Sequence, residues 1–213
     1  ILMAYDEFSN TSDPGPISGQ KWIEEVLDKA ASKMASEKII LGIAGYGYDW
    51  KFDESGKPLT DTAGNRVPAS VVNYSEALDK ARAAGADVEF DNDNFNLHYN
   101  YAKEDNNQTI QHVVWFTGAV TTYNILRFSD EYSTAGTALW VMGNEDRRLW
   151  SFYNRDLSNE ALDKNPFDYN SLLALPYDIN QKPTAVGEEG GELLRVLNTP
   201  QTGSVSLEID TAE

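Results

Sequence analysis

The chain has 213 residues, with 34 Asp and Glu against 17 Lys and Arg, a formal net charge of −17 and no Cys. This negative charge argues against binding to nucleic acid or to anionic membranes, because both require Lys and Arg to replace the counterions of phosphate groups. The lack of Cys excludes disulfides and thiol chemistry, and it is compatible with secretion through an oxidising compartment. A neutral partner such as a glycan suits this composition, with solubility alone as the competing explanation of the charge.

No apolar run approaches the roughly 18 residues that a membrane-spanning helix requires. The chain opens directly on the apolar run Ile1-Leu2-Met3-Ala4-Tyr5, without a leader before it. We therefore expect it to be a piece cut from a longer polypeptide.

The first 43 residues predict a strand, a helix and a second strand. Residues 1–6 are typical of a short buried strand, and a loop rich in Ser, Asp, Pro and Gly follows at 9–19. Residues 20–35 place their apolar side chains in one stripe at helical spacing. The continuous apolar run at 38–43 indicates a strand covered on both faces, so the three segments form a βαβ unit. The aromatic sequence AGYGYDW that follows predicts a loop at the carboxyl end of that strand.

The segment 52–111 is polar and predicts a small α+β insertion. It contains one helix at 75–84, ended by Gly85, and strand-like pieces that include 109–115. The run Asp91-Asn92-Asp93-Asn94 is similar to a calcium loop, but it lacks the Gly and the terminal Glu at the required offsets, so we expect a turn.

Beyond the insertion, a helix is expected at 119–132 and a third apolar strand at 137–142. The Leu149–Tyr153 segment is expected to pack behind this strand. Residues 154–213 form a polar tail in which two alternating runs, 192–197 and 204–209, predict a β-hairpin.

Three segments in this order resemble the glycoside hydrolase family 18, the chitinase-like hydrolases. Met3-Ala4-Tyr5-Asp6 is similar to the M-x-Y-D signature of the sixth barrel strand in that family. Ile40–Ile43 followed by Gly45-Tyr46-Gly47 resembles the seventh strand, and Trp140 resembles the Trp that ends the eighth strand. The insertion also falls where members of the family carry one.

The resemblance implies an α/β fold, namely the C-terminal portion (strands 6–8) of a (β/α)8 barrel. The barrel portion would comprise 1–51 and 112–153, the insertion 52–111, and a small β-rich tail 154–213. Bacterial envelope proteins that fuse such a domain to a polysaccharide deacetylase and a glycosyltransferase are also similar, and the tail resembles their inter-domain segment.

The family cleaves β-1,4 links next to N-acetylglucosamine with retention, using the acetamido oxygen of the substrate as the nucleophile. Its general acid is a Glu in a D-x-x-D-x-D-x-E motif upstream of M-x-Y-D, and no such spacing occurs in this chain. We therefore expect no catalytic residue here and no hydrolysis by this chain alone, with chitin and peptidoglycan both open as substrates of the parent protein.

The resemblance assigns substrate-binding roles to Met3, Tyr5, Asp6, Tyr46 and Trp140. Tyr5 would donate a hydrogen bond to the acetamido carbonyl, Asp6 would accept from sugar hydroxyls, and Met3 would line the pocket floor. Trp140 would face the sugar, and Tyr46 would stack at an outer subsite, as would Trp50. The competing interpretations are an ordinary strand end for Tyr5 and Asp6, core packing for Met3 and Trp140, and packing on the insertion for the loop aromatics.

The sequence departs from the family pattern at three places. Tyr48 stands where the family often has Arg, Ala44 where it often has Pro, and Thr117-Gly118 where it often has an acidic pair. His98 and His112, the two histidines, have no acidic ligand pattern nearby, so we expect neither a metal nor a cofactor.

The expected partners are an N-acetylglucosamine-containing polysaccharide and the remainder of the parent chain, in an extracellular or cell-envelope setting. The alternative function is a non-catalytic carbohydrate-binding or scaffolding module of a multidomain envelope enzyme. An intact acidic motif in the parent would favour hydrolysis, and a replaced final Glu would favour binding.

Overall fold

The computed structural model describes residues 1–175. Within this range the strands form two sheets, one parallel and one antiparallel. The helices α1, α2 and α3 cover them, and shorter helices follow. The bounds of the helical elements are α1 Gln20–Ala31, η1 Ser36–Lys38, α2 Tyr74–Ala84, α3 Ala119–Glu131, η2 Arg147–Ser151, α4 Asn159–Lys164 and α5 Asn170–Leu173. Those of the strands are β1 Ile40–Ala44, β2 Gly47–Phe52, β3 Ser70–Val72, β4 Glu89–Phe90, β5 Leu97–Asp105, β6 Gln108–Phe116 and β7 Gly136–Trp140.

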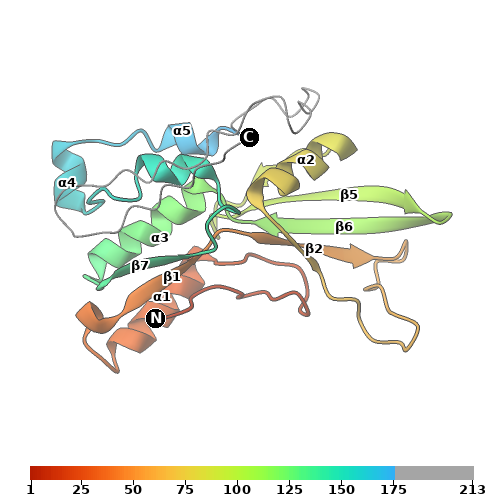
Figure 1. Ribbon diagram of the computed structural model, residues 1–213, viewed down its shortest axis with the longest axis horizontal. Coiled ribbons are helices and arrows are strands. Elements are labelled where there is room, and N and C mark those ends of the chain that lie inside the picture. The colour runs from red at the N-terminus through yellow and green to blue at the C-terminus, as the bar shows by residue number, and fades with distance from the viewer. Residues whose placement is uncertain (176–213) are drawn as a thin grey trace, which may run out of the picture. The chain divides into compact units, whose positions relative to one another are not determined.

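The parallel sheet pairs β1 with β7, from Ile40 opposite Gly136 to Ala44 opposite Trp140. Leu2 adds one parallel bridge to Leu41 on the other side of β1. Helices α1 and α3 pack against each other and share one apolar core with β1 (Figure 1). The α/β character predicted from the apolar runs is therefore confirmed.

The predicted strand at 1–6 is wrong in its extent. Pairing is limited to Leu2, because the Ala4 N–H donates back to the Leu2 carbonyl and Asp6 turns the chain with φ of 61°. A left-handed residue cannot continue a strand, so the chain leaves the sheet at this point.

The antiparallel sheet has the order β3-β2-β6-β5-β4 in the described part of the chain. Figure 1 shows α2 lying over β5 and β6, where it buries a second apolar core. The sheet extends from Gly47 to Phe116, beyond both predicted limits of the insertion at 52 and 111. The predicted loop at AGYGYDW is therefore largely strand, because Tyr48, Trp50 and Phe52 alternate with small or polar residues and pack on one face.

The two sheets meet where β1 passes into β2. A Cβ added at Gly47 would lie 2.3 Å from the Phe116 Cβ, so only glycine permits the close approach of β2 to β6 there. Thr117, which follows β6, donates from its hydroxyl to the carbonyls of Ala44 (2.9 Å) and Tyr46 (3.1 Å). The chain therefore passes between the two sheets twice at this place, once from β1 to β2 and once after β6, and the Thr117 hydrogen bonds join the two crossings.

Outside the two sheets, the predicted elements agree with the structure only in part. Helix α1 ends at Ala31, earlier than the predicted 35, and the separate 3-10 turn η1 follows. The segment after β7 packs behind it as expected, with Leu149 and Phe152 fully buried. The tail 154–213 contributes α4 and α5 up to residue 173, whereas the predicted hairpin at 192–197 and 204–209 lies outside the described residues. None of the helices within 1–175 is long and apolar enough to cross a membrane.

Helix α2 has well-defined ends. Asn73 accepts a hydrogen bond from the Glu76 N–H, and the Glu76 side chain accepts from the Asn73 N–H, which forms a capping box. At the other end Gly85 adopts the left-handed conformation, as predicted.

Replacing Asn73 with Ala removes the side-chain acceptor of the capping box. We expect N73A to lower the free energy of unfolding by about 1 kcal/mol, measured by denaturant titration. The matched variant N73D keeps an acceptor and should remain within about 0.5 kcal/mol of the wild type. Equal losses in both variants would contradict a capping role.

Candidate functional site

The predicted residues Tyr5, Asp6 and Tyr46 lie together beside the carboxyl end of β1. The Asp6 Oδ1 accepts hydrogen bonds from the hydroxyls of Tyr46 (2.5 Å) and Tyr48 (2.9 Å). The rings of Tyr5 and Tyr46 meet edge to face, with centroids 6.3 Å apart. Two neutral donors thus fix one oxygen of an otherwise exposed carboxylate.

The phenols of this cluster keep their protons. Burial, followed by the hydrogen bond to Asp6, raises the pKa of Tyr48 to about 12 and that of Tyr46 further still. Burial and the charge of Asp6 also raise the pKa of Tyr5. No residue among 1–175 accepts a hydrogen bond from the Tyr5 hydroxyl, so this group is available to donate to a ligand.

The two aromatic residues expected to stack on sugars at outer subsites are buried in this chain. Tyr46 is 6% exposed and Trp50 is 1% exposed, and both pack with Ile17 and Tyr48 in a third apolar cluster. Their rings are therefore packed, as the competing interpretation had it. The Tyr46 hydroxyl takes part in the site by donating a hydrogen bond to Asp6.

Trp140 and Met3 lie on either side of β1 and are open to solvent. Trp140 ends β7 opposite Ala44, and its backbone carbonyl accepts a hydrogen bond from the Gly45 N–H at 2.7 Å. Trp140 is 60% exposed and Met3 is 67% exposed, so neither is packed as a core residue. Trp140 therefore lies one strand away from the segment that carries Tyr5 and Asp6.

The turn after Trp140 holds two buried carboxylates. Glu145 accepts hydrogen bonds from the Trp150 indole at 3.0 Å and from the Gly143 N–H. Asp146 accepts from the Ala119 N–H at the start of α3 and pairs with Arg148 at 2.7 Å. These contacts hold the turn in place. Trp140, which precedes the turn, remains exposed.

The departures from the family pattern have structural counterparts. Tyr48, in place of the Arg, supplies Asp6 with an uncharged donor. Thr117 replaces an acidic residue and fastens the junction between the sheets. Gly118 is the N-cap residue that precedes α3, and a Cβ added there would lie 2.9 Å from Leu97 Cδ1.

Sequence reasoning missed a polar cluster on the other face of β2. Asp49 is 1% exposed and lies 2.7 Å from both His112 Nδ1 and Lys80 Nζ. The sequence pattern around His112 gave no sign of this contact, because β2 and β6 bring together residues that are distant in sequence. The alternation of Tyr48 and Trp50 with Asp49 and Lys51 was the available signal.

The run 91–94 forms the expected turn, since Asp91 Oδ1 accepts from the N–H groups of Asp93 and Asn94. Among residues 1–175 no group of three His, Asp or Glu side chains is arranged to hold a metal ion.

Known proteins are similar to this chain over most of its described length. No protein-family profile matches it. The uncharacterized glycosylase YvbX of Bacillus subtilis is 24% identical over 149 residues, which is 70% of this chain and 39% of YvbX. The spore cortex-lytic enzyme SleL of Bacillus cereus superposes with a TM-score of 0.57 and 30% identity, covering 70% of this chain and 32% of SleL. A chitinase from Chromobacterium violaceum gives a TM-score of 0.57 and 28% identity, with 70% and 42% covered.

The matched part is thus the larger share of this chain but less than half of each relative. These similarities establish an α/β fold of the kind found in chitinase barrels. The position of each strand within a complete barrel stays a prediction.

Removing the charge of Asp6 should lower the pKa of Tyr48. In the D6N variant, we expect the Tyr48 pKa to fall from about 12 towards its ordinary value, without reaching it because the burial remains. The titration can be followed by NMR of the tyrosine ring carbons, with the amide spectrum reporting that the chain stays folded.

Tyr132 is a matched control, because its pKa of about 12 arises first from a hydrogen bond to Asp28. D6N should leave it unchanged and D28N should lower it. A Tyr48 pKa that is the same in D6N and wild type would show that Asp6 does not engage this hydroxyl.

Proposed function

We propose that this chain, which resembles a segment of the chitinase-like glycoside hydrolases of family 18, provides the sugar-binding part of an enzyme that acts on β-1,4-linked N-acetylglucosamine polymers. The relatives are described as a chitinase, a glycosylase and a spore cortex-lytic enzyme, which supports a glycan as the substrate class. Their descriptions also support a place of action at the cell envelope or outside the cell.

The observation that carries the proposal is the arrangement at the carboxyl ends of neighbouring strands. The free hydroxyl of Tyr5 and the fixed carboxylate of Asp6 lie beside β1, and the exposed ring of Trp140 ends the adjacent β7. In α/β barrels, ligands bind at this end of the strands.

Each side chain then has a role that its chemistry permits. Tyr5 donates a hydrogen bond to the acetamido carbonyl, and its raised pKa keeps the donor proton in place. The second oxygen of Asp6 accepts from a sugar hydroxyl, because Tyr46 and Tyr48 engage Oδ1 and orient the carboxylate. Trp140 offers a flat apolar face to the less polar side of a sugar ring.

The proton donor for cleavage is supplied by another part of the parent protein. The acidic motif of the family does not occur in this sequence, and the buried Glu145 is engaged by Trp150 and Gly143. The exposed apolar side chains beside the parallel sheet, Ile1, Met3 and Val141, would be covered by further strands of the barrel.

The alternative is a non-catalytic carbohydrate-binding or scaffolding module. The exposure of Trp140 supports it as well, because an exposed aromatic ring binds sugar without any proton donor. Hydrolysis by the full-length parent, abolished when its upstream Glu is changed to Gln, would decide for the enzyme.

The chain alone should not turn over an N-acetylglucosamine oligomer. We expect no product from the tetramer by mass spectrometry under conditions in which a complete family 18 chitinase degrades it fully, because a glycosidic oxygen is a poor leaving group without a proton donor. Saturable hydrolysis by the purified chain would contradict the proposal.

Binding of the same oligomer should depend on Trp140. We expect W140A to weaken binding about tenfold, equivalent to roughly 1.4 kcal/mol, as measured by isothermal titration calorimetry. The control W22F changes a Trp on α1 that packs against the apolar core and is not one of the proposed site residues, and it should bind as the wild type does. Equal affinity of W140A and the wild type for the oligomer would show that Trp140 does not contact the sugar.

A further inference from the structure

A pocket lies on the antiparallel sheet, between α2 and the strands β2, β5 and β6. It encloses about 360 Å³, which is within the range of small-molecule sites. Its polar lining comprises Asp49, Lys51, Lys80, Lys103, His112 and Tyr101. Small alanine side chains, including Ala83 and Ala84, complete the wall and leave room for the body of a ligand.

The charge of this pocket is opposite to that of the chain. The protein has a net charge of −17, yet three of its 17 Lys and Arg line this pocket together with a single acidic residue, Asp49. Such a concentration of cations raises the local potential for anions.

Asp49 offsets the charge of Lys80, with which it forms an ion pair, and leaves the charges of Lys51 and Lys103. Oδ1 lies 2.7 Å from His112 Nδ1, and Oδ2 accepts from Lys80 (2.7 Å) and Tyr101 (3.2 Å). Burial alone would raise the pKa of Asp49, but the hydrogen bonds from His112 and Lys80 outweigh it and hold the pKa below its ordinary value. Lys51 and Lys103 form no ion pair with any residue of 1–175 and therefore keep their charge for a ligand.

The aromatic groups of the pocket are held rigidly. His112 stacks on Tyr101 with centroids 4.2 Å apart, and Tyr101 stacks in turn on Tyr99. Nδ1 of His112 faces Asp49, while Nε2 has no hydrogen-bonding partner within the described chain. The stacked rings of His112, Tyr101 and Tyr99 and the buried Asp49 carboxylate thus preorganise the pocket.

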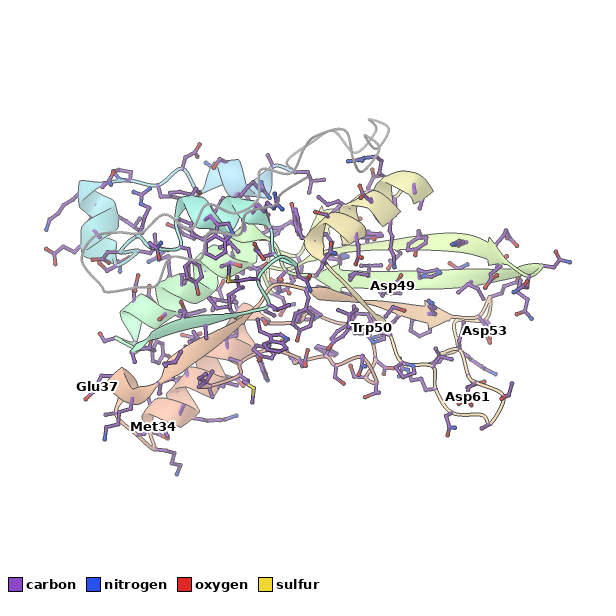
Figure 2. The ribbon with its side chains drawn as sticks, viewed as in Figure 1. Met34, Glu37, Asp49, Trp50, Asp53 and Asp61 are labelled. Carbon is purple, nitrogen blue, oxygen red and sulfur yellow. The ribbon has the colours of Figure 1, made fainter. Side chains whose placement is uncertain are left out.

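This pocket is separate from the site that contains Asp6. Asp49 and Trp50 project from opposite faces of β2 (Figure 2), and Tyr46 and Tyr48 share the face of Trp50. A ligand beside Asp49 would therefore lie across the sheet from the Asp6 cluster.

We propose that this pocket binds an oxyanion carried by a sugar, either a carboxylate or a phosphate. Lys51 and Lys103 supply the positive charge, and the rings of His112 and Tyr101 form the wall beside it. The anion preference follows from the pocket itself, whereas the sugar rests on the proposed function. The pocket would give the protein a preference for acidic over neutral glycans.

The test is an NMR titration of the chain with N-acetylmuramic acid and with glucose 6-phosphate. N-acetylglucosamine is the neutral control, because it lacks the lactyl carboxylate of N-acetylmuramic acid. We expect saturable shifts of the His112 ring and of the Lys51 and Lys103 amides with at least one acidic sugar, and none of these shifts with the neutral one. Shifts of equal size with the neutral sugar, or no shifts with either acidic sugar, would overturn the proposal.

The double variant K51Q/K103Q should bind the acidic sugar about tenfold more weakly, since it loses two charged contacts. The control K29Q/K33Q removes the same charge from two exposed lysines, one on α1 and one in the turn that follows it, and should bind like the wild type. Equal weakening of binding in both double variants would show that only the net charge of the protein matters, and it would overturn the proposed site.

Acetate and inorganic phosphate separate the anion from its carrier. If they bind as tightly as the acidic sugars, the anion site stands and its link to a sugar is overturned. These outcomes are independent of Trp140, so failure here and failure of the proposed function can be distinguished.

Discussion

The arrangement of both sheets depends on the hydrogen bonds from Thr117 to the carbonyls of Ala44 and Tyr46. At this point β1 has just ended and β2 is about to begin, and the chain has just left β6 of the antiparallel sheet. The missing side chain of Gly47 allows the two backbones to approach there. The same junction positions Tyr46 and Tyr48, whose hydroxyls donate to Asp6.

The strand β2 engages two carboxylates, one on each face, and the two are stabilised by different donors. Asp6 accepts from uncharged phenols and keeps an open side towards solvent. Asp49 is buried, and it is paired with the charged Lys80 and lies within hydrogen-bonding distance of His112. One face of the strand thus presents a hydrogen-bonding carboxylate suited to neutral hydroxyls, and the other presents spare positive charge.

The exposed apolar residues of the parallel sheet agree with the partial coverage of the relatives. The chain matches 32% of SleL and 42% of the chitinase, so much of each relative lies outside the aligned region. In this chain β1 is paired on both sides, whereas Met3 and Trp140 face solvent. In the function proposed above, these open side chains are the ones that further strands or a glycan would contact.

The sequence by itself determined the α/β class, helix α2 with its Gly85 end, and the strands near 40 and 137, because each depends on local periodicity or on one special residue. The M-x-Y-D motif and Trp140 also predicted the candidate binding residues. Only the tertiary structure decided that residues 1–6 pair at a single position, that Tyr46 and Trp50 are buried, and that Asp49 meets His112. These features arise from strand pairing between segments far apart in the chain, and a local pattern contains no information about which distant strand will lie opposite.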